Sequence, residues 1–345
     1  MALRQVDNPP NPYLSEHRQW LGPPPEVRVE VYEETAVTII TENDSPDIPF
    51  RWSINPYRGC QHACAYCYAR PYHEYLGFGA GTDFDTRLVV KTNAAELLRS
   101  ALAKPKWRGR SFAFSGITDP YQPIEASYAV TRRCLEACVE FGNAASIVTK
   151  NILVVRDAEL LAALHRRAEA RVYLSIPFAD DETARAIEPY APPPSRRFEA
   201  IRRLVAAGIP VGVMVAPIIP GLNDRDIPAI LERAAACGAR SAGHIALRLP
   251  RSVAPVFLSR LRSALPLKAA RVESRIREMR GGGLNEARFG RRMGGEGEYW
   301  KSVKSLFELT ARRLGFETAR RDESPALPTP PDRPVELHQL SFDFS

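Results

Sequence analysis

The sequence predicts an α/β protein built around a partial (β/α)6 barrel of the TIM type. Short strand-like runs alternate with amphipathic stretches between about residues 47 and 250, and six strand candidates lie in this interval. Strands separated by helices form parallel sheets with right-handed crossovers. The length of 345 residues suits one large domain with extensions, and 45% hydrophobic with 25% charged residues is typical of a soluble globular protein.

The six strand candidates are Arg51–Asn55, Phe112–Ser115, Ser146–Thr149, Val172–Ile176, Val211–Ala216 and Gly243–Leu247. The helix candidates between them are Thr92–Ala103, Glu125–Phe141, Asp157–Ala168, Ser195–Ala207 and Asp224–Cys237. In a barrel of this kind the functional residues gather at the C-terminal ends of the strands, where the loops begin.

Extensions flank this barrel, which we expect to occupy residues 46–285. Residues 1–45 are proline-rich and then β-branched, which predicts an extended lead-in with one strand that pairs with the main domain. Further helices are predicted at Val253–Ala264, Ala269–Met279 and Tyr299–Leu314. Residues 286–320 form a C-terminal loop and helix cap, and the proline-rich residues 321–345 predict a disordered tail.

The composition bears on the cellular location of the protein, on disulfide bonds and on the charge of its partners. No run of about 18 apolar residues and no signal-peptide core occur, which predicts a cytoplasmic protein without membrane association. Six cysteines in a chain of this length do not suggest a disulfide framework. The net charge is +7, and only seven of the 47 basic residues are lysine. Because the guanidinium fork suits phosphate and carboxylate groups, this bias weakly favours an anionic partner.

Three cysteines, Cys60, Cys64 and Cys67, follow the first strand candidate with the spacing C-x3-C-x2-C. A structural zinc site needs four protein ligands, whereas a four-iron cluster accepts three thiolates and leaves one iron open. A zinc site completed by a distant histidine and three unrelated core cysteines are the alternatives. The position after a strand and a Pro56–Gly59 turn, where a loop can wrap a cluster, favours the iron–sulfur interpretation.

The spacing, with the aromatic Tyr66 before the last cysteine, resembles the signature of the radical S-adenosylmethionine (SAM) superfamily. The surrounding sequence resembles the branch related to the spore photoproduct lyases, which split a linked thymine pair in DNA. It is more similar to an uncharacterised bacterial group in this branch than to the lyases. The similarity covers about residues 50 to 290, and its motifs are Asn55–Cys60, Cys67–Gly77, Ser115–Pro120 and Thr149–Asn151.

The resemblance implies a 4Fe-4S cluster ligated by Cys60, Cys64 and Cys67. The open iron of such a cluster chelates the amino and carboxylate groups of SAM, and the cluster donates an electron that splits SAM into methionine and a 5′-deoxyadenosyl radical. The reaction implies an external reductant such as flavodoxin or ferredoxin.

The resemblance also implies the SAM contacts. Tyr66 would place its backbone beside the adenine, and Lys150 would pair with the methionine carboxylate. Ser175 would bond the ribose or the carboxylate, and the turn of residues 216–221 would pack beneath the adenine. The segment that binds the amino group would contain Ser115, Gly116, Thr118 and Asp119. Each side chain also has a plainer interpretation: a turn residue before Pro120 for Asp119, a strand-end hydroxyl for Ser175 and a solvated surface cation for Lys150.

One departure from the lyases concerns the hydrogen donor. The lyases carry a thiol on the segment that matches Ser115–Asp119, but here no cysteine lies between Cys67 and Cys134. We therefore expect no photoproduct repair, although Tyr66 and Tyr68 beside Cys67 remain as possible relays.

Other cysteines and histidines have weaker signals. Cys134 and Cys138 stand four residues apart on a predicted helix and share one face, either as ligands of an auxiliary cluster or as small apolar core residues. His62 lies within the cysteine loop, and His73 with Glu74 follows it. These side chains either move protons and bind substrate or hold the loop in place.

The segment from Arg271 to Arg292 is rich in arginine, at positions 271, 275, 277, 280, 288, 291 and 292. Arginine with Phe289 beside a glycine-rich loop suits a phosphate backbone, whereas a solvated helix and a hydrogen-bonded cap are the plainer interpretation. On the first interpretation of this segment, we expect a nucleic-acid substrate.

The C-terminal residues Gln339–Phe344 form a second candidate interface. The run Gln-Leu-Ser-Phe-Asp-Phe after a proline-rich tether resembles the peptide by which bacterial replication and repair proteins dock on the sliding clamp. Chance similarity and docking onto the chain's own domain are the alternatives.

Two hypotheses follow for the whole protein. The first is a radical SAM enzyme related to the spore photoproduct lyases, with an unidentified substrate for which nucleic acid is the expected class. The second is a non-catalytic scaffold that binds zinc or a cluster and bridges DNA to repair or replication partners.

Overall fold

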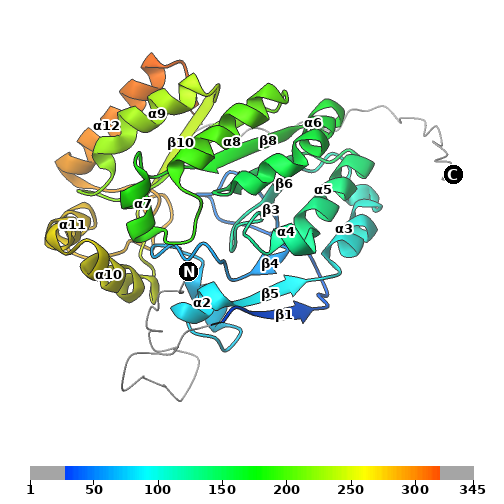
Figure 1. Cartoon of the computed structure of the whole chain (residues 1–345), viewed down its shortest axis with the longest axis horizontal. Coiled ribbons are helices and arrows are strands. Elements are labelled where there is room, and N and C mark those ends of the chain that lie inside the picture. The colour runs from blue at the N-terminus through cyan, green and yellow to red at the C-terminus, as the bar shows by residue number, and fades with distance from the viewer. Residues whose placement is uncertain (1–27, 319–345) are drawn as a thin grey trace.

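The computed structural model describes residues 28–318, which form two sheets (Figure 1). The large sheet has the strand order β11-β10-β9-β8-β7-β6-β3-β2. Its six central strands run parallel, and they are β3 (Trp52–Ile54), β6 (Phe112–Phe114), β7 (Ala145–Thr149), β8 (Ala170–Ser175), β9 (Val211–Ile218) and β10 (Ser241–Ala246). These six strands coincide with the six predicted ones, so the partial (β/α)6 barrel is confirmed.

The edges of the large sheet carry two short strands. β2 (Ile40–Glu42) pairs antiparallel with β3, and β11 (Glu317–Thr318) pairs parallel with β10. The barrel therefore stays open, because each edge ends on a strand that pairs on one side only.

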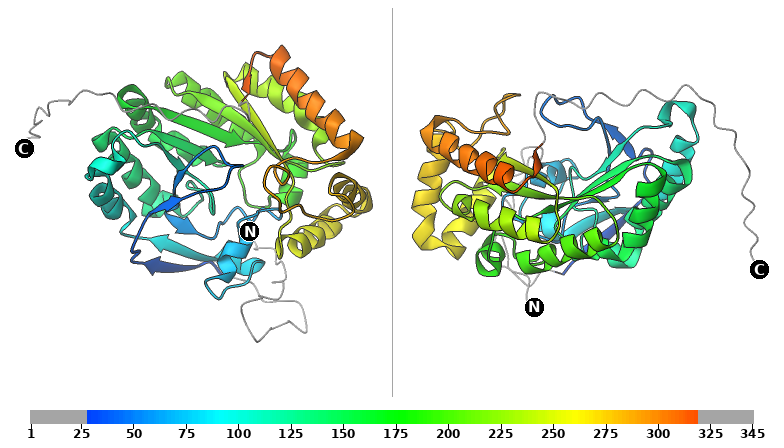
Figure 2. Two further views of the ribbon diagram at one scale, coloured as in Figure 1. Left: turned by 180° about the vertical axis from the view of Figure 1, so that it is seen from behind. Right: turned by 90° about the horizontal axis from the view of Figure 1, so that it is seen from above.

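Alternating burial along the strands explains how the sheet is covered. Ile147 in β7 faces Val172 in β8 across the register, and both are fully buried. Their neighbours Ser146 and Tyr173 are only half-buried, because successive side chains point to opposite faces. The apolar face packs under helices (Figures 1 and 2), which are α3 (Ala94–Leu102), α5 (Val130–Phe141), α6 (Ala158–Arg167), α8 (Pro194–Ala206) and α9 (Ile227–Ala236).

The predicted helix Glu125–Phe141 is wrong in one respect, since it is two helices. α4 (Glu125–Tyr128) ends at Ala129, whose φ of 50° is left-handed, and α5 starts at the next residue. The buried Glu125 carboxylate accepts hydrogen bonds from the Thr131 amide at 2.9 Å and the Arg132 amide at 3.2 Å. A carboxylate at the start of α5 satisfies amides that have no partner within the helix, which explains why the chain breaks here.

The N-terminal segment forms two strands where the sequence predicts one. β1 (Glu30–Glu34) lies in the small sheet, in the order β1-β5-β4, with β5 (Arg87–Lys91) and β4 (Tyr57–Arg58). Asn93 ties the segment between β1 and β2 to α3, because its side chain accepts from the Ala36 amide and donates to the Ala36 carbonyl, both at 2.9 Å. Two short helices near this sheet were not predicted, α1 (Arg70–Glu74) and α2 (Thr82–Thr86).

The C-terminal helices form the second part of the core. α10 (Val253–Ala264) packs on α11 (Pro266–Met279) and on α7 (Asp181–Ile187), and α12 (Gly297–Arg313) packs on α9. One apolar cluster joins α10 and α11 to the segment that contains the cysteines, and it includes Cys64, Tyr66, Phe257, Leu261 and Val272. The predicted C-terminal helices therefore cover the cysteine loop from one side.

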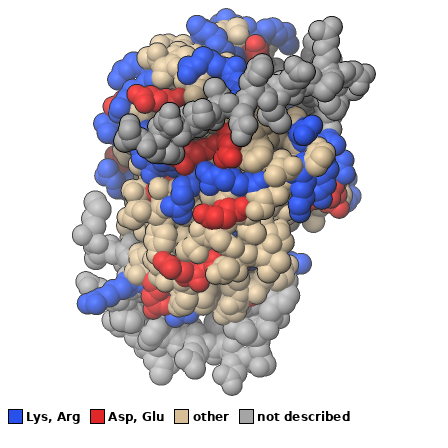
Figure 3. Space-filling model, turned by 90° about the vertical axis from the view of Figure 1, so that its right-hand side faces the viewer, with Lys and Arg blue, Asp and Glu red and all other residues tan. Residues whose placement is uncertain are grey.

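Two further features concern the surface. The helices within residues 28–318 are too short or too polar to cross a membrane. Figure 3 shows basic and acidic side chains interspersed on one face, so the surplus positive charge does not form a single large patch there.

The predicted tail 321–345 and its segment Gln339–Phe344 lie outside the described residues.

Candidate functional site

The three predicted cysteines lie on one tightly folded loop that follows β4. All three are free thiols, with Cys60 and Cys64 buried and Cys67 half-buried. The loop starts at Gly59, whose φ is 75° and where a Cβ atom would lie 2.9 Å from the Phe84 carbonyl oxygen. The Cys60 amide donates to that same carbonyl oxygen at 2.9 Å. A side chain at position 59 would therefore prevent this close approach.

Arg70, which is fully buried, fixes the centre of the loop. Its guanidinium donates to the Cys64 carbonyl oxygen through Nε at 3.1 Å and Nη2 at 3.0 Å. It also donates to the Ala80 and Gly81 carbonyl oxygens and pairs with Asp85 at 2.9 Å. All of its donors near the loop thus have acceptors, which is the condition under which a buried arginine is tolerated.

The segment after β6 fixes the start of the loop. The Thr118 hydroxyl and the Gln122 side-chain amide donate to the Gly59 carbonyl oxygen at 2.7 and 3.1 Å. Gln122 also accepts from the Gln61 amide at 3.0 Å. The structure thus places Thr118 against the cysteine loop, in contact with its backbone.

Asp119 connects three loops at the barrel rim. Its carboxylate accepts from the Thr149 hydroxyl at 2.7 Å and the Lys150 amide at 2.8 Å, and it lies 3.4 Å from His62 Nδ1. Burial alone raises the pKa of Asp119, but His62 and these hydrogen bonds outweigh burial and lower it to about 2. Asp119 therefore stays ionised at neutral pH. His62 is held on its other side, because Nε2 lies 3.2 Å from the Asn151 side-chain nitrogen.

A second polar group lies on the other side of the loop. Lys150 Nζ donates to the Ser175 hydroxyl at 3.1 Å and lies 3.9 Å from Glu188 Oε1 and 5.7 Å from the Tyr66 ring centre. The Tyr66 hydroxyl donates to Glu188. Three of the predicted residues, Tyr66, Lys150 and Ser175, are thus brought together around Glu188.

Glu188 and its partner Arg197 were missed by the sequence analysis. Both are fully buried, and Arg197 donates to Glu188 and to the Ser175 carbonyl oxygen. Neither residue stands in a recognisable motif, since Glu188 follows α7 and Arg197 lies inside α8. Only the fold brings them to the rim.

The remaining predicted residues lie at strand ends. Ser115 and Gly116 follow β6, and Asn55 supports this segment by accepting from the Ile117 amide at 3.1 Å. The turn of residues 216–221 follows β9, and the buried Asn223 side chain bonds the Ile219 amide and the Pro177 and Pro217 carbonyl oxygens. All ten predicted site residues therefore lie in the cysteine loop or at the ends of β6, β7 and β8.

The three thiols are the ligands that this loop offers to a metal group. Within residues 28–318, no three histidine, cysteine, aspartate or glutamate side chains converge as ligation of one metal ion requires. Burial raises the pKa of all three thiols, and neighbouring Asp119 and Glu188 raise those of Cys60 and Cys64 respectively. Burial and the nearby carboxylates therefore keep the three thiols protonated in the absence of metal. Metal coordination deprotonates a thiol, so a bound metal group would convert them to thiolates.

The other candidate cysteines and His73 are packed among apolar or aromatic side chains. Cys134 and Cys138 are fully buried in the main core, and Cys237 packs against it. His73 packs between Phe78 and Phe84, and burial lowers its pKa to about 4, so it is neutral at pH 7.

The arginine-rich segment is internally bonded. Each of its seven arginines bonds a carboxylate or a carbonyl oxygen of the chain. Arg288 and Arg291, with exposed side-chain fractions of 66% and 46%, pair with Glu286 and Glu296 respectively and with no other carboxylate in residues 28–318. Exposed pairs of this kind are weak and exchange readily with other partners.

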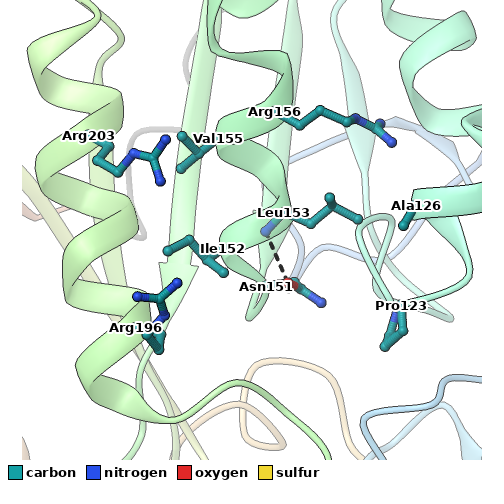
Figure 4. A pocket seen from close by; sticks show the side chains of 9 residues that line it. All are labelled: Pro123, Ala126, Asn151, Ile152, Leu153, Val155, Arg156, Arg196 and Arg203. Atoms are coloured by element: carbon teal, nitrogen blue, oxygen red, sulfur yellow. Dashed lines mark hydrogen bonds between the residues drawn. The ribbon is translucent and has the colours of Figure 1, made fainter.

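A surface depression of about 490 Å³ lies on the helical side, between α8 and the 3-10 helix η2 (Ile152–Asp157) (Figure 4). Arg156, Arg196 and Arg203 line it, together with Asn151, which also contacts His62. None of the ten predicted site residues lines this depression.

Comparison with known proteins gives a consistent result. A family model described as the radical SAM superfamily matches residues 54–234, just over half of the chain. An uncharacterised protein of Mycobacterium tuberculosis is 41% identical over 234 residues, which cover 67% of this chain and 68% of the relative. A protein of Pseudomonas phage M6 called radical SAM Nalpha-GlyT isomerase is 28% identical over 186 residues, covering 53% of this chain and 36% of that protein.

Among solved structures, the chain is similar to spore photoproduct lyase complexed with dinucleoside spore photoproduct. The TM-score is 0.58 at 19% identity, and the match covers 87% of each chain. At this identity the likeness concerns the fold.

Proposed function

The chain belongs to the radical SAM superfamily, and on this premise we propose that it is a SAM-cleaving enzyme whose 4Fe-4S cluster is held by Cys60, Cys64 and Cys67. When bound, such a cluster supplies an electron that cleaves SAM to methionine and a 5′-deoxyadenosyl radical. The observation that carries the proposal is the cysteine loop, which offers three free thiols and is clamped by Arg70, Thr118 and Gln122.

The residues at the barrel rim would bind and orient SAM. Lys150 and Ser175 offer a cation and a hydroxyl suited to the carboxylate or ribose of SAM. Asp119 stays ionised, so its negative charge would attract the ammonium group of SAM. The hydrogen bonds that Asp119 accepts from Thr149 and Lys150 hold the segment Ser115–Asp119 in place. Thr118 acts on the loop backbone, so its role is positioning.

The proposed substrate class is nucleic acid. The similar lyase structure holds a dinucleoside, and the chain carries exposed tyrosines beside the cysteine loop. The segment Ser115–Asp119 lacks a cysteine, so the proposed reaction is not photoproduct reversal.

The test of this proposal is anaerobic reconstitution with iron and sulfide, followed by dithionite and SAM. We expect a brown protein that forms 5′-deoxyadenosine, and we expect Cys64→Ala to abolish this product. Cys237→Ala is the matched control and should retain it, because Cys237 lies away from the loop. A colourless zinc protein that releases no deoxyadenosine would contradict the proposal. Flavodoxin or ferredoxin in place of dithionite tests the proposed reductant.

We also propose that Gln339–Phe344 docks on the bacterial sliding clamp. The segment supplies one amide and two aromatic anchors at the end of a proline-rich stretch. Full-length protein should bind a purified clamp in analytical ultracentrifugation, and a Gln339→Ala/Phe344→Ala double variant should not. Equal binding by both proteins would dismiss the proposal.

A further inference from the structure

Arg248, which follows β10 at the barrel rim, has no carboxylate partner within residues 28–318. Its Nη1 lies 3.7 Å from the Met293 sulfur, and its guanidinium carbon lies 6.0 Å from the Tyr68 ring centre. Its Nε is buried and without a hydrogen-bond partner in the described part of the chain. A weak sulfur contact and a distant cation–π contact with the Tyr68 ring do not replace the hydrogen bonds that a partly buried guanidinium loses, so this cation is kept at an energetic cost.

Neighbouring arginines add to this local positive charge. Arg280 donates to the Leu247 and Gly294 carbonyl oxygens and, within residues 28–318, makes no ion pair with a carboxylate. Arg292 does pair with Asp47, at 2.6 Å. Burial lowers the pKa of Arg248, and the charge of Arg292 lowers it further, while Asp47, which pairs with Arg292, offsets this lowering only in part. An incoming anion would supply the missing charge and the missing acceptor.

Exposed aromatic rings lie beside this cation. Tyr68, Tyr72 and Tyr75 have exposed fractions of 45%, 50% and 60%, and all three lie within eight residues of Cys67. The Tyr72 and Tyr75 ring centres are 6.3 Å apart. Tyr68 contacts Arg248, and Tyr72 lies near enough to Arg248 to influence its pKa. Exposed aromatic rings stack on bases irrespective of sequence, and an arginine fork beside them matches a phosphodiester.

We propose that Arg248, Tyr68 and Tyr72 form a substrate platform that binds an unpaired stretch of nucleic acid, with a phosphodiester on Arg248 and bases against the tyrosines. This inference rests on the proposed function, because it places the substrate directly beside the cysteine loop. It identifies the substrate as a single-stranded or unstacked segment, since bases within a duplex do not expose their faces to stacking.

The test measures binding of a fluorescein-labelled oligothymidylate to the full-length, anaerobically reconstituted protein by fluorescence anisotropy. Arg248→Gln should weaken binding by about tenfold, the effect of losing one charged hydrogen bond. The matched control is Arg262→Gln, an exposed arginine of α10 that pairs with Glu273 of α11, and it should bind within twofold of wild type. Equal affinity of the two variants, or no binding by wild type, would overturn the proposal.

Further readouts separate the proposal from its rivals. The slope of log affinity against log salt should fall by about one in Arg248→Gln, which removes the charge on the phosphate, and should stay near the wild-type slope in Arg248→Lys, which keeps that charge. An unchanged slope in Arg248→Gln would contradict the proposal. Equilibrium dialysis with SAM tests the other source of an anion. If Arg248→Gln loses SAM affinity and keeps oligothymidylate affinity, the guanidinium serves the SAM carboxylate and the platform is wrong. Deoxyadenosine formation by wild type without nucleic acid tests the proposed function separately.

Discussion

Two fully buried arginines, Arg70 and Arg197, organise the site at the scale of single residues. Arg70 bonds the backbone of the cysteine loop and Asp85, whereas Arg197 bonds Glu188 and the end of β8. A buried ion pair contributes little net stability, but removal of one partner leaves the other charge unpaired. These arginines therefore specify where the loops lie.

Arg70→Met should lower the free energy of unfolding by about 3 kcal/mol or more, because Asp85 and the Cys64 carbonyl oxygen lose their buried partner. Denaturant titration of the anaerobic protein measures this loss. Arg99→Met is the control, since Arg99 is exposed and pairs with Glu140 on the surface, and its cost should be at most about 1 kcal/mol. Equal costs for the two variants would show that Arg70 does not hold the loop.

Lys150→Met should weaken SAM binding by about tenfold, because the methionine chain fills similar space without the charge that would pair with the SAM carboxylate. Isothermal titration of the reconstituted protein measures the affinity. Lys301→Met, in an exposed pair with Glu298, serves as control and should bind SAM like wild type. Unchanged affinity in Lys150→Met would return Lys150 to a structural role with Ser175 and Glu188.

Among the elements, the cysteine loop depends on Gly59, where no other residue fits without strain. Gly59→Ala should sharply reduce the iron content of the reconstituted protein, because the added Cβ would meet the Phe84 carbonyl oxygen at 2.9 Å in a left-handed conformation. Iron and protein assays on matched preparations measure this ratio.

Gly77→Ala is the matched control for this substitution. Gly77 has nearly the same φ, 76°, but has no atom near its added Cβ, so only the backbone conformation opposes the alanine, at about 1 kcal/mol. We expect Gly77→Ala to bind iron like wild type. If the two variants bind iron equally, the close approach at Gly59 does not shape the loop.

Local patterns predict the elements of the barrel well. The six parallel strands follow from short apolar runs such as Val211–Ala216, whose residues lie under helices. The break at Ala129 escaped prediction, because it depends on the buried Glu125 carboxylate and not on a glycine or proline. The small sheet was also missed, since β4 has only two residues and pairs with a strand about thirty residues later.

Prediction of the site was uneven for a similar reason. The cysteines form a local motif, and Lys150 and Ser175 stand at strand ends, so the sequence locates them. Glu188 and Gln122 carry no motif and reach the rim only through tertiary packing. The structure also changes the interpretation of Thr118, which contacts the loop backbone, and of the seven arginines, which bond the chain itself.

At the scale of the whole molecule, the cysteine loop lies between the barrel rim and the C-terminal helices. Cys64 and Tyr66 share an apolar cluster with α10 and α11, while Cys60 packs with Phe84 in a separate cluster. Cys67 packs against both clusters and so connects the two sides of the loop. A group bound to these cysteines would therefore couple parts of the chain that are distant in sequence.

Removal of the bound iron should consequently destabilise the fold well beyond the loop itself. We expect chelation under anaerobic conditions to lower the thermal midpoint by several degrees, because ligand binding to the native state contributes directly to stability. Differential scanning calorimetry of matched loaded and stripped samples measures the shift. Identical midpoints would mean that the loop is fully formed without metal.

We propose that three thiolates hold a cluster whose remaining iron is open to SAM. Electron paramagnetic resonance of the dithionite-reduced protein, recorded with and without SAM, tests it most directly. We expect the signal of a reduced 4Fe-4S cluster that changes when SAM is added. A signal indifferent to SAM, or a protein that contains zinc and no iron–sulfur signal, would contradict it.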